Sequence, residues 1–593
     1  MNQRMGWDAG EHWFAALELT QLLKHGYVLK ALTKMNSLAA YWPPLPTLWT
    51  CLFHLFGGPS YSVAIFSTGM LAVVFTAYFA KLAGSAPINQ SDERNRSTDT
   101  DLLLGIITAL IPWFLPLFQR YMLSSMFEVA GALFTLIALQ LYVANLAAIR
   151  EGKRARWGCV GIAALAVVLV KYYYAIYLFG AFLLTAWFLI RGSRRVWMRP
   201  GSVCAVLCLV LALGGAKLGG TFNLGRHFVK AWLWVWNTAG IGLLIVDLFR
   251  SRHAFWRPFA LWVLLPMAAW MTIPNPNRYW AIWAIISEAH ASECTGLTWS
   301  SGCWGYYLSE WYRYGGGLLA LTSVAMAFGL LLLWKRSSEY LRVWSVASLT
   351  YAIPLFLVMT FVSRNKQVRY IITVIPIALF SSAFFVRRLL LLFRARQRTF
   401  VRRAVLGASA ALCLGLCMTL VVFPLKAVSD QIFHIEAYGT RPGGDEATLK
   451  MLFDELRTTT VPTKVYFDYP YSGEFHARWL LHDIELGVAA PPRFFGSVQR
   501  ELLRSNHQWV GDLEDAKIRR IVLLTFENSS HPLREVSESA LNRFEKRVLR
   551  AGDGRIWILE RRAGDSMVSA LGSLSPTVGY TGVSPPFVLG PIE

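Results

Sequence analysis

Asp8, Glu11 and His12 are the first residues in the chain that suggest a reaction. They lie in the segment GWDAGEHWF, directly ahead of a stretch with amphipathic helical spacing. A carboxylate held beside a hydroxyl or an amine can take its proton as a general base. The same carboxylates could instead cap the helix and interact with its dipole, which requires no function. The segment supplies a candidate base, Asp8 or Glu11, and the structural alternative stays open.

Glu128 is the second candidate, in FQRYMLSSMFEVAGALF (118–134). It lies about one turn inside a long apolar run. A carboxylate at that depth in a membrane is costly and indicates a functional site. The alternative is a structural acid that snorkels or pairs with a serine. Arg120 and Tyr121 are expected at the same edge of the run.

A basic cluster forms the third candidate, in SRNKQVRYIITVIPIALF (363–380). Arg364, Lys366 and Arg369 are followed directly by Tyr370. Such a cluster at a membrane edge suits an anionic partner such as a lipid phosphate, through charge-assisted hydrogen bonds. The alternative is pairing with carboxylates of the protein. Weaker members of the basic set are Lys171, Arg226, His227 and Lys230.

Long apolar runs must position these residues. Of the 593 residues, 55% are hydrophobic and 16% are charged, whereas a soluble protein has about 25% charged residues. Twelve runs approach the length that a membrane-spanning helix needs. They are 61–80, 102–117, 124–147, 158–171, 172–190, 202–218, 231–249, 258–273, 312–334, 343–361, 370–386 and 404–424.

The loops between these runs predict the orientation. One alternate set of loops carries 24 Lys and Arg, and the other set carries 10. The positive-inside rule therefore places residues 1–60 and everything after about 425 on the non-cytoplasmic side. The same rule accounts for the net charge of +22, and no zinc-finger spacing occurs. We expect the lipid bilayer, and not nucleic acid, as a partner.

The chain is predicted to have four regions. Residues 1–60 form an outside acidic loop with amphipathic helices, which YWPPLP (41–46) interrupts. Residues 61–425 form the transmembrane helical domain, and residues 426–562 form an extracytoplasmic α/β domain. Residues 563–593, rich in Gly, Ser and Pro, are expected to be a poorly ordered tail.

The α/β domain is predicted from short apolar segments. KVYFDY (464–469), RRIVLLTF (519–526) and GRIWILER (554–561) are expected to be strands, with helices over 474–485 and 531–549. In the loop ECTGLTWSSGC, Cys294 and Cys303 are candidates for a disulfide if the compartment is oxidising. Two unpaired thiols are the alternative.

These motifs, in this order, resemble the GT-C superfamily of polyprenyl-phosphate-sugar-dependent glycosyltransferases. The resemblance is greatest to its protein O-mannosyltransferase and lipid A aminoarabinose transferase group. That group has an acidic first outside loop, an aromatic-Pro-Pro-Leu element and then Phe-Gly. It also has an arginine stretch with a later acid, and an Arg-Tyr followed by Pro. The matching segments are DAGEHWF (8–14), YWPPL (41–45), LFG (55–57), QRYMLSSMFEV (119–129) and VRYIITVIP (368–376).

The resemblance implies inverting transfer of a monosaccharide from a polyprenyl-phosphate donor to a protein, lipid or glycan, outside the inner (plasma) membrane. Asp8 would be the base, with Glu11 as the fallback. Glu128 matches a second acid that is commonly Asp in relatives. The residues expected to bind the lipid phosphate and sugar are Arg120, Tyr121, Lys171, Arg364, Lys366, Arg369 and Tyr370. No cofactor or metal site is assigned.

One departure from the family concerns the start of the chain. Relatives begin with a transmembrane helix before the acidic loop, whereas only seven residues precede Asp8 here. We therefore expect that this helix is missing from the chain.

Two functions of other classes stay open. One is a transporter or flippase for a lipid-linked or anionic solute, although no internal repeat is evident. The other is a non-catalytic protein of cell-envelope assembly. Within the superfamily, an oligosaccharyltransferase is disfavoured because its WWDYG motif is absent from the sequence. The segment EWYRYGG (310–316) resembles that motif only superficially.

Overall fold

The structure of the protein is a computed structural model, and its chain divides into two compact units. One unit is Met1–Pro442 with Glu474–Asp483, and the other is Gly443–Gly473 with Ile484–Glu593. The residues described in the helical unit are 7–38, 43–58, 61–85, 99–115, 117–118, 121, 127–190, 199–222, 224–251, 253–273, 275, 277–287, 303, 305–314, 338–363 and 367–395. In the other unit they are 451, 455, 463–467, 499–502, 513, 519–526, 538–551 and 554–562.

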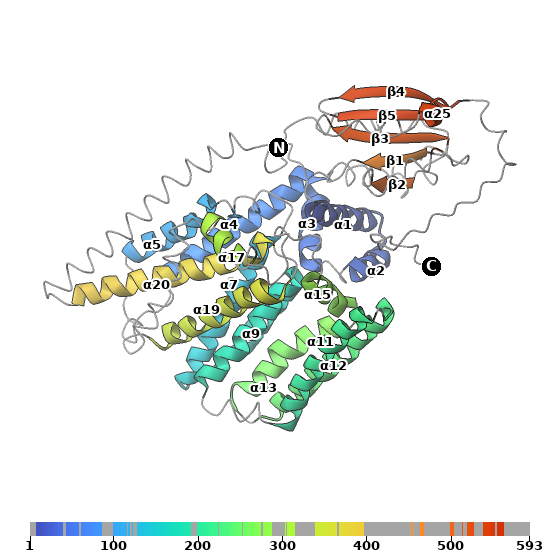
Figure 1. The fold of residues 1–593 in the computed structure, drawn as a ribbon. Coiled ribbons are helices and arrows are strands. Elements are labelled where there is room, and N and C mark those ends of the chain that lie inside the picture. The colour runs from blue at the N-terminus through green and yellow to red at the C-terminus, as the bar shows by residue number, and fades with distance from the viewer. Residues whose placement is uncertain are drawn as a thin grey trace. The chain divides into compact units, whose positions relative to one another are not determined.

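Within the described residues, six helices are long and apolar enough to cross a membrane. They are α4 (Tyr61–Ser85), α7 (Glu128–Arg150), α9 (Tyr172–Leu189), α11 (Pro200–Thr221), α12 (Arg226–Phe249) and α19 (Glu339–Leu357), which the π-helical turn η5 (Val358–Val362) extends. The protein is therefore a polytopic membrane protein. Figure 1 shows α7, α9 and α19 side by side, and α11 and α12 as a neighbouring antiparallel pair.

Other described helices lie after residue 60 in the helical unit. They are α5 (Asp99–Leu110) with η2 (Ile111–Phe114), α8 (Trp157–Val170), α13 (Trp256–Phe259) with η3 (Ala260–Leu264) and α14 (Leu265–Thr272), α15 (Asn277–Ser287), α17 (Tyr306–Tyr314), η6 (Val368–Ile371) and α20 (Val374–Ala395). The predicted spans from 61–80 to 258–273, and those at 343–361 and 370–386, fall on described helices. The span 404–424 and most of 312–334 lie outside the described residues, so the total of twelve stays a prediction.

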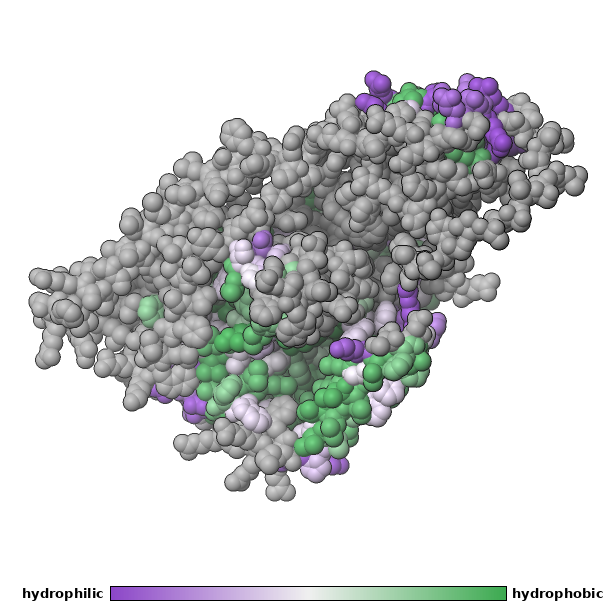
Figure 2. All heavy atoms as spheres, viewed as in Figure 1, coloured by the Kyte–Doolittle hydropathy of each residue, from purple (hydrophilic) through white to green (hydrophobic). Residues whose placement is uncertain are grey.

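Many large hydrophobic side chains are exposed on the described helices of the helical unit. Figure 2 shows this surface in the region of α9, α11 and α12. Large hydrophobic side chains point outward there, including Leu207, Val210, Val235 and Leu243. Surface of this kind is stable against lipid hydrocarbon and would be unfavourable in water. The pattern agrees with helices that face a bilayer.

The described residues among the first 60 form three helices and the short turns that border them. They form α1 (Trp7–Lys24), α2 (Val28–Leu38) and α3 (Pro44–Gly57). The prolines lie at the start of α3, where a missing N–H costs no helical hydrogen bond. Arg278 connects α2 to α15, because its Nη2 donates to Asn36 Oδ1 at 3.3 Å while its guanidinium stacks on Trp270 at 3.9 Å.

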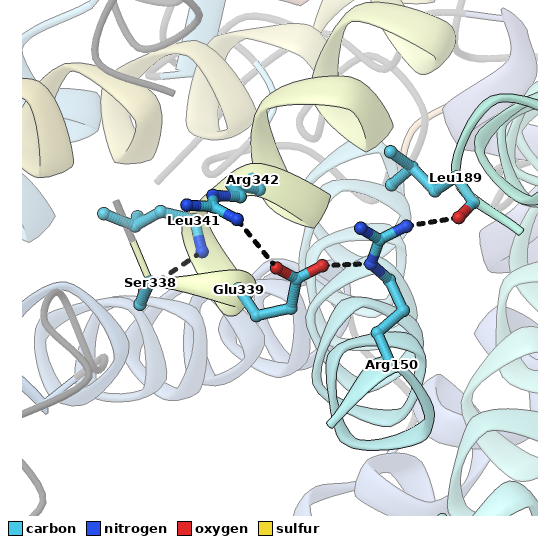
Figure 3. Close-up of polar contacts among 6 residues, drawn as sticks. All are labelled: Arg150, Leu189, Ser338, Glu339, Leu341 and Arg342. Carbon is cyan, nitrogen blue, oxygen red and sulfur yellow. Dashed lines mark hydrogen bonds and ion pairs between the residues drawn. The ribbon is translucent and has the colours of Figure 1, made fainter. Parts of the chain in front are cut away.

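An ion-pair cluster joins α7, α9 and α19 at the C-terminal ends of α7 and α9 (Figure 3). Arg150, the last residue of α7, pairs with Glu339 and donates to the carbonyl oxygen of Leu189. Glu339 also pairs with Arg342, whose Nη1 lies 3.3 Å from Oε2. Ser338 caps α19 by accepting a hydrogen bond from the backbone N–H of Leu341 at 3.3 Å. These contacts fix the three helices to one another.

The second unit contains a five-stranded sheet in the order β2-β1-β3-β5-β4. Its strands are β1 (Thr463–Phe467), β2 (Gln499–Leu502), β3 (Arg520–Phe526), β4 (Phe544–Ala551) and β5 (Gly554–Arg561). β1 is parallel to β2 and β3, whereas β5 is antiparallel to β3 and β4. The three predicted strands are confirmed as β1, β3 and β5.

The predicted helix over 531–549 is wrong in its second half. Among the residues described there, α25 (Glu538–Leu541) is helical, whereas residues 544–551 form β4. β4 is an edge strand, and its charged residues suit an edge because they discourage pairing with another chain. Only Gly552 and Asp553 separate β4 from β5, which is the spacing of a tight hairpin. The predicted helix over 474–485 lies outside the described residues.

Candidate active site

Glu128 is the first residue of α7 and is fully buried, with a side-chain exposure of 0%. The amide groups of a first helical turn have no helical partners, and the helix dipole favours a negative charge there. The local sequence therefore stabilises a carboxylate at this point. Glu128 accepts no hydrogen bond from the residues that the structure describes. Its charge is compensated by two cations.

Lys171 is the first of these cations and lies in the break between α8 and α9. Its backbone is extended, with φ −157° and ψ 117°, so the two helices are separate as predicted. The side chain is buried, and Nζ lies 3.2 Å from Glu128 Oε1. The position at the C-terminal end of α8 also favours a positive charge.

Arg369 is the second cation and belongs to the short 3₁₀ helix η6. Its Nε lies 3.8 Å from the same Glu128 oxygen, and its side chain is 13% exposed. Two cations that are far apart in sequence thus meet at the carboxylate of Glu128. The structure therefore brings together Glu128, Lys171 and Arg369, which the sequence offered as separate candidates. For Arg369, the alternative of pairing with a protein carboxylate is also realised.

Three buried tyrosines surround the ion cluster. The ring of Tyr173 makes edge-on contacts with Tyr174 and Tyr370, at centroid distances of 4.3 and 4.8 Å. Tyr174 Oη donates to the carbonyl oxygen of Arg369 at 3.1 Å. The guanidinium of Arg369 lies 5.6 Å from the Tyr370 ring centroid. α9 is therefore fixed to η6 by both a hydrogen bond and aromatic packing.

Gly131 allows α7 and α9 to approach at this point. A Cβ atom at position 131 would lie 2.3 Å from Cε2 of Tyr174, which is closer than real Cβ contacts occur. Gly131 follows Glu128 by three residues, so both occupy one face of α7. The absence of a side chain at Gly131 lets the Tyr174 ring pack beside the turn that carries Glu128.

The N-terminal acidic segment is joined to the start of α7 through His12. The His12 ring makes an edge-on contact with Phe127 at a centroid distance of 5.9 Å, and both residues are buried. Phe127 directly precedes Glu128. Asp8 and Glu11 lie in the same helix α1, and Asp8 is one turn before His12. The side chains of Asp8 and Glu11 are outside the described set.

The other predicted residues have different outcomes. Tyr121 is buried, whereas Arg120, Arg364, Lys366 and Cys294 lie outside the described residues. Cys303 is buried and takes part in a disulfide bond, but its pairing with Cys294 stays a prediction.

The weaker basic residues lie on α12. Arg226 and His227 are exposed at its start. Lys230 Nζ lies 5.9 Å from the Trp280 ring centroid. Among the described residues, no group of three or more His, Cys, Asp or Glu could hold a metal ion.

Sequence reasoning missed Tyr173, Tyr174 and Gly131 as parts of the site. The run KYYY that begins at Lys171 was a signal, because three consecutive aromatic residues follow a lysine inside an apolar stretch. Gly131 carried no such signal. Its role depends on a ring from α9, which is distant in sequence.

Comparisons with known proteins give few relatives. No family model matches the chain, and no curated protein matches it. Among solved structures, the chain is similar to ArnT from Cupriavidus metallidurans bound to undecaprenyl phosphate, with 12% identity and a TM-score of 0.42, over 97% of this chain and 96% of that one. The apo state of the same ArnT gives 12% identity and a TM-score of 0.46, over 94% of each chain.

Proposed function

We propose that this protein is a membrane glycosyltransferase of the GT-C type. It would transfer a monosaccharide from a polyprenyl-phosphate-linked donor to an acceptor on the extracytoplasmic face of the inner membrane. One observation carries the proposal. Glu128, Lys171 and Arg369 converge among three contacting tyrosines, and His12 of the helix that contains Asp8 and Glu11 contacts Phe127 beside Glu128. A buried group of this kind at a helix end suits a charged headgroup whose lipid tail stays in the bilayer.

Lys171 and Arg369 are assigned to the phosphate of the donor. A lysine ammonium has three N–H donors and a guanidinium has five. Each cation can therefore keep its contact with Glu128 and still offer a donor to a phosphate oxygen. Charge-assisted contacts of this kind are strongest where water is excluded, and both side chains are largely buried.

Glu128 is assigned as a positioning residue rather than the base. Its Oε1 atom lies between the two cations, at 3.2 Å from Lys171 Nζ and 3.8 Å from Arg369 Nε. A carboxylate that is occupied in this way holds the cations at a fixed separation. A base must instead reach the proton of the acceptor.

Asp8 is assigned as the base, with Glu11 as the alternative. In the proposed step, the acceptor hydroxyl or amine loses its proton to the carboxylate and attacks the anomeric carbon. The bond from that carbon to the phosphate oxygen breaks, and polyprenyl phosphate leaves with the electron pair. Attack from the face opposite the leaving group inverts the anomeric configuration. Without Asp8 the acceptor keeps its proton, so transfer stops and the donor is not cleaved to polyprenyl phosphate.

A donor panel tests the proposal. The purified protein is incubated with several polyprenyl-phosphate sugars and candidate acceptors, and mass spectrometry measures polyprenyl phosphate and glycosylated product. The expected result is turnover of at least one donor. If no donor is consumed, but a labelled polyprenyl-phosphate lipid crosses the bilayer of proteoliposomes, a transporter is the correct class.

A further inference from the structure

Tyr173 has a buried hydroxyl group that the proposed roles leave unused. The residue lies in the first turn of α9, two positions after Lys171, and is 5% exposed. Its Oη atom has no hydrogen-bond partner among the residues that the structure describes. A buried hydroxyl without a partner is unfavourable, because it has lost water and gained nothing in return. Such a group is expected where a ligand supplies the missing partner.

The surroundings of Tyr173 indicate the charge of that partner. The Tyr173 ring contacts Tyr370, which directly follows Arg369, and Arg369 Nε lies 3.8 Å from Glu128 Oε1. Lys171 Nζ lies 5.9 Å from the centre of the Tyr173 ring. Protonated lysine and arginine donate hydrogen bonds and accept none. Among these neighbours only Glu128 could act as an acceptor, and it takes no hydrogen bond within the described part of the chain.

The neighbouring tyrosine gives a comparison within the same turn. The Tyr174 hydroxyl donates to the Arg369 carbonyl oxygen at 3.1 Å, which is a structural contact between α9 and η6. The Tyr173 ring packs against the rings of Tyr174 and Tyr370, whereas its hydroxyl has no hydrogen-bond partner of normal geometry among the described residues. This arrangement presents a neutral donor beside two cations.

We propose that Tyr173 is a further catalytic residue, whose hydroxyl donates a hydrogen bond to a phosphate oxygen of the departing polyprenyl phosphate. The inference rests on the proposed function and adds a residue to it. When the bond between the anomeric carbon and the phosphate oxygen breaks, the bonding electrons pass to that oxygen. The phosphodiester with one negative charge becomes a monoester with two. A fixed donor at that oxygen gains strength as the charge develops, and so it lowers the barrier.

Tyr173→Phe tests the hydroxyl, because it removes one oxygen and keeps the ring packing. The expected result is a fall of about 10- to 100-fold in kcat, with a change of less than about threefold in KM for the donor. Tyr142→Phe is the matched control. It removes another buried hydroxyl, which donates to the Phe182 carbonyl oxygen at 2.6 Å, and its ring packs against Trp157, Phe182 and Phe255. The control should lower thermal stability and leave kcat unchanged.

A binding measurement gives a readout that is independent of turnover. Polyprenyl monophosphate and the uncharged polyprenol are titrated into the full-length protein in nanodiscs. Tyr173→Phe should weaken binding of the monophosphate about tenfold and leave polyprenol binding unchanged. This ratio compares two lipids on the same folded molecules, so it is informative even if the variant is less stable.

The outcomes separate the two proposals. If the wild-type protein turns over a donor, and Tyr173→Phe matches it in kcat and in monophosphate binding, the role of Tyr173 is wrong and the proposed function stands. If the wild-type protein consumes no donor of the panel, the proposed function fails. In that case a loss of monophosphate binding in Tyr173→Phe would still support a phosphate contact at this hydroxyl. Unchanged binding would refute that contact.

Discussion

Replacing Gly131 by alanine should damage the site through one added methyl group. The new Cβ would lie 2.3 Å from Cε2 and 2.6 Å from Cδ2 of Tyr174. The Tyr174 ring cannot simply rotate away, because it is fully buried and its hydroxyl is bonded to the Arg369 carbonyl oxygen. Either α7 and α9 separate, or the ring moves and pulls η6 with it. Both changes alter the distances from Glu128 to Lys171 and Arg369.

Overpacking of this kind costs about 1–3 kcal/mol. Alanine is a better helix former than glycine by about 1 kcal/mol, which acts in the opposite direction. The overlap at two ring carbons is severe, so we expect a net loss of stability. The loss of donor affinity should exceed what this stability change alone explains, because the displaced segment carries Arg369, which the proposal assigns to the donor phosphate.

The measurements are thermal unfolding in detergent and binding of polyprenyl monophosphate. Gly180→Ala is the matched control, because Gly180 is also in a helix and a Cβ there would meet nothing within 4 Å. It should unfold at the wild-type temperature or slightly above it. In a Tyr174→Ala background, Gly131→Ala should have almost no additional cost, since the clashing ring is gone. Equal behaviour of Gly131→Ala and Gly180→Ala would refute the reasoning.

Three further substitutions test other parts of the proposal. Asp8→Asn should reduce transfer at least about 100-fold, as expected for loss of a general base, while the protein stays folded and inserted; wild-type turnover would exclude Asp8 as the base. Arg369→Ala should weaken donor binding about 10- to 100-fold and acceptor binding less, so equal effects in titrations of both substrates would count against the phosphate assignment. Burial lowers the pKa of His54 in α3, although its hydrogen bond with the Gly58 carbonyl oxygen opposes the shift. The unfolded chain therefore binds a proton before the folded one, and stability should decrease as the pH falls below about 6.5. In thermal unfolding between pH 7.5 and 5.5, His54→Asn should show a smaller decrease than the wild type, and an equal decrease would contradict this role.

The positions of the charged residues were predictable because a membrane makes each buried charge unfavourable. Glu128 stood out in sequence for that reason, and Lys171 was a weaker candidate. Arg369 stood out because basic residues are rare on the non-cytoplasmic side, where the sequence predicts this segment. Their meeting at 3.2 and 3.8 Å was not predictable. It depends on how α7, α9 and η6 pack, and apolar runs contain little information about which helices become neighbours.

The break between α8 and α9 at Lys171 was also predictable in part: the sequence predicted two helices but not the backbone conformation between them. The apolar run from 158 to 190 is too long for one simple crossing, so two helices were expected. The extended backbone at Lys171 itself could not be inferred, because lysine has no special preference for that conformation. In the second unit, apolar strands were predicted correctly. The charged edge strand β4 was predicted as a helix, because its pattern lacks the apolar face by which a strand is recognised.

The two ion clusters at the ends of α7 have different consequences. Glu128 and Arg150 are the first and last residues of this helix. The intervening 22 residue steps span about 33 Å, close to the thickness of the hydrocarbon layer. Both clusters therefore lie near a membrane edge, where a structural ion pair needs only to join neighbouring helices.

Burial distinguishes the two clusters. The Arg150 side chain is 30% exposed, whereas Glu128 is 0% exposed. An ion pair that reaches water has a small desolvation penalty. The cluster of Arg150 with Glu339 and the Leu189 carbonyl oxygen is therefore explained as a structural contact that joins the helix ends (Figure 3). A fully buried carboxylate with two cations has a large desolvation penalty, and it gives little more stability than apolar packing would. Persistence of that arrangement at Glu128 is best explained by a charged ligand, and the phosphate of a lipid-linked donor has the required charge.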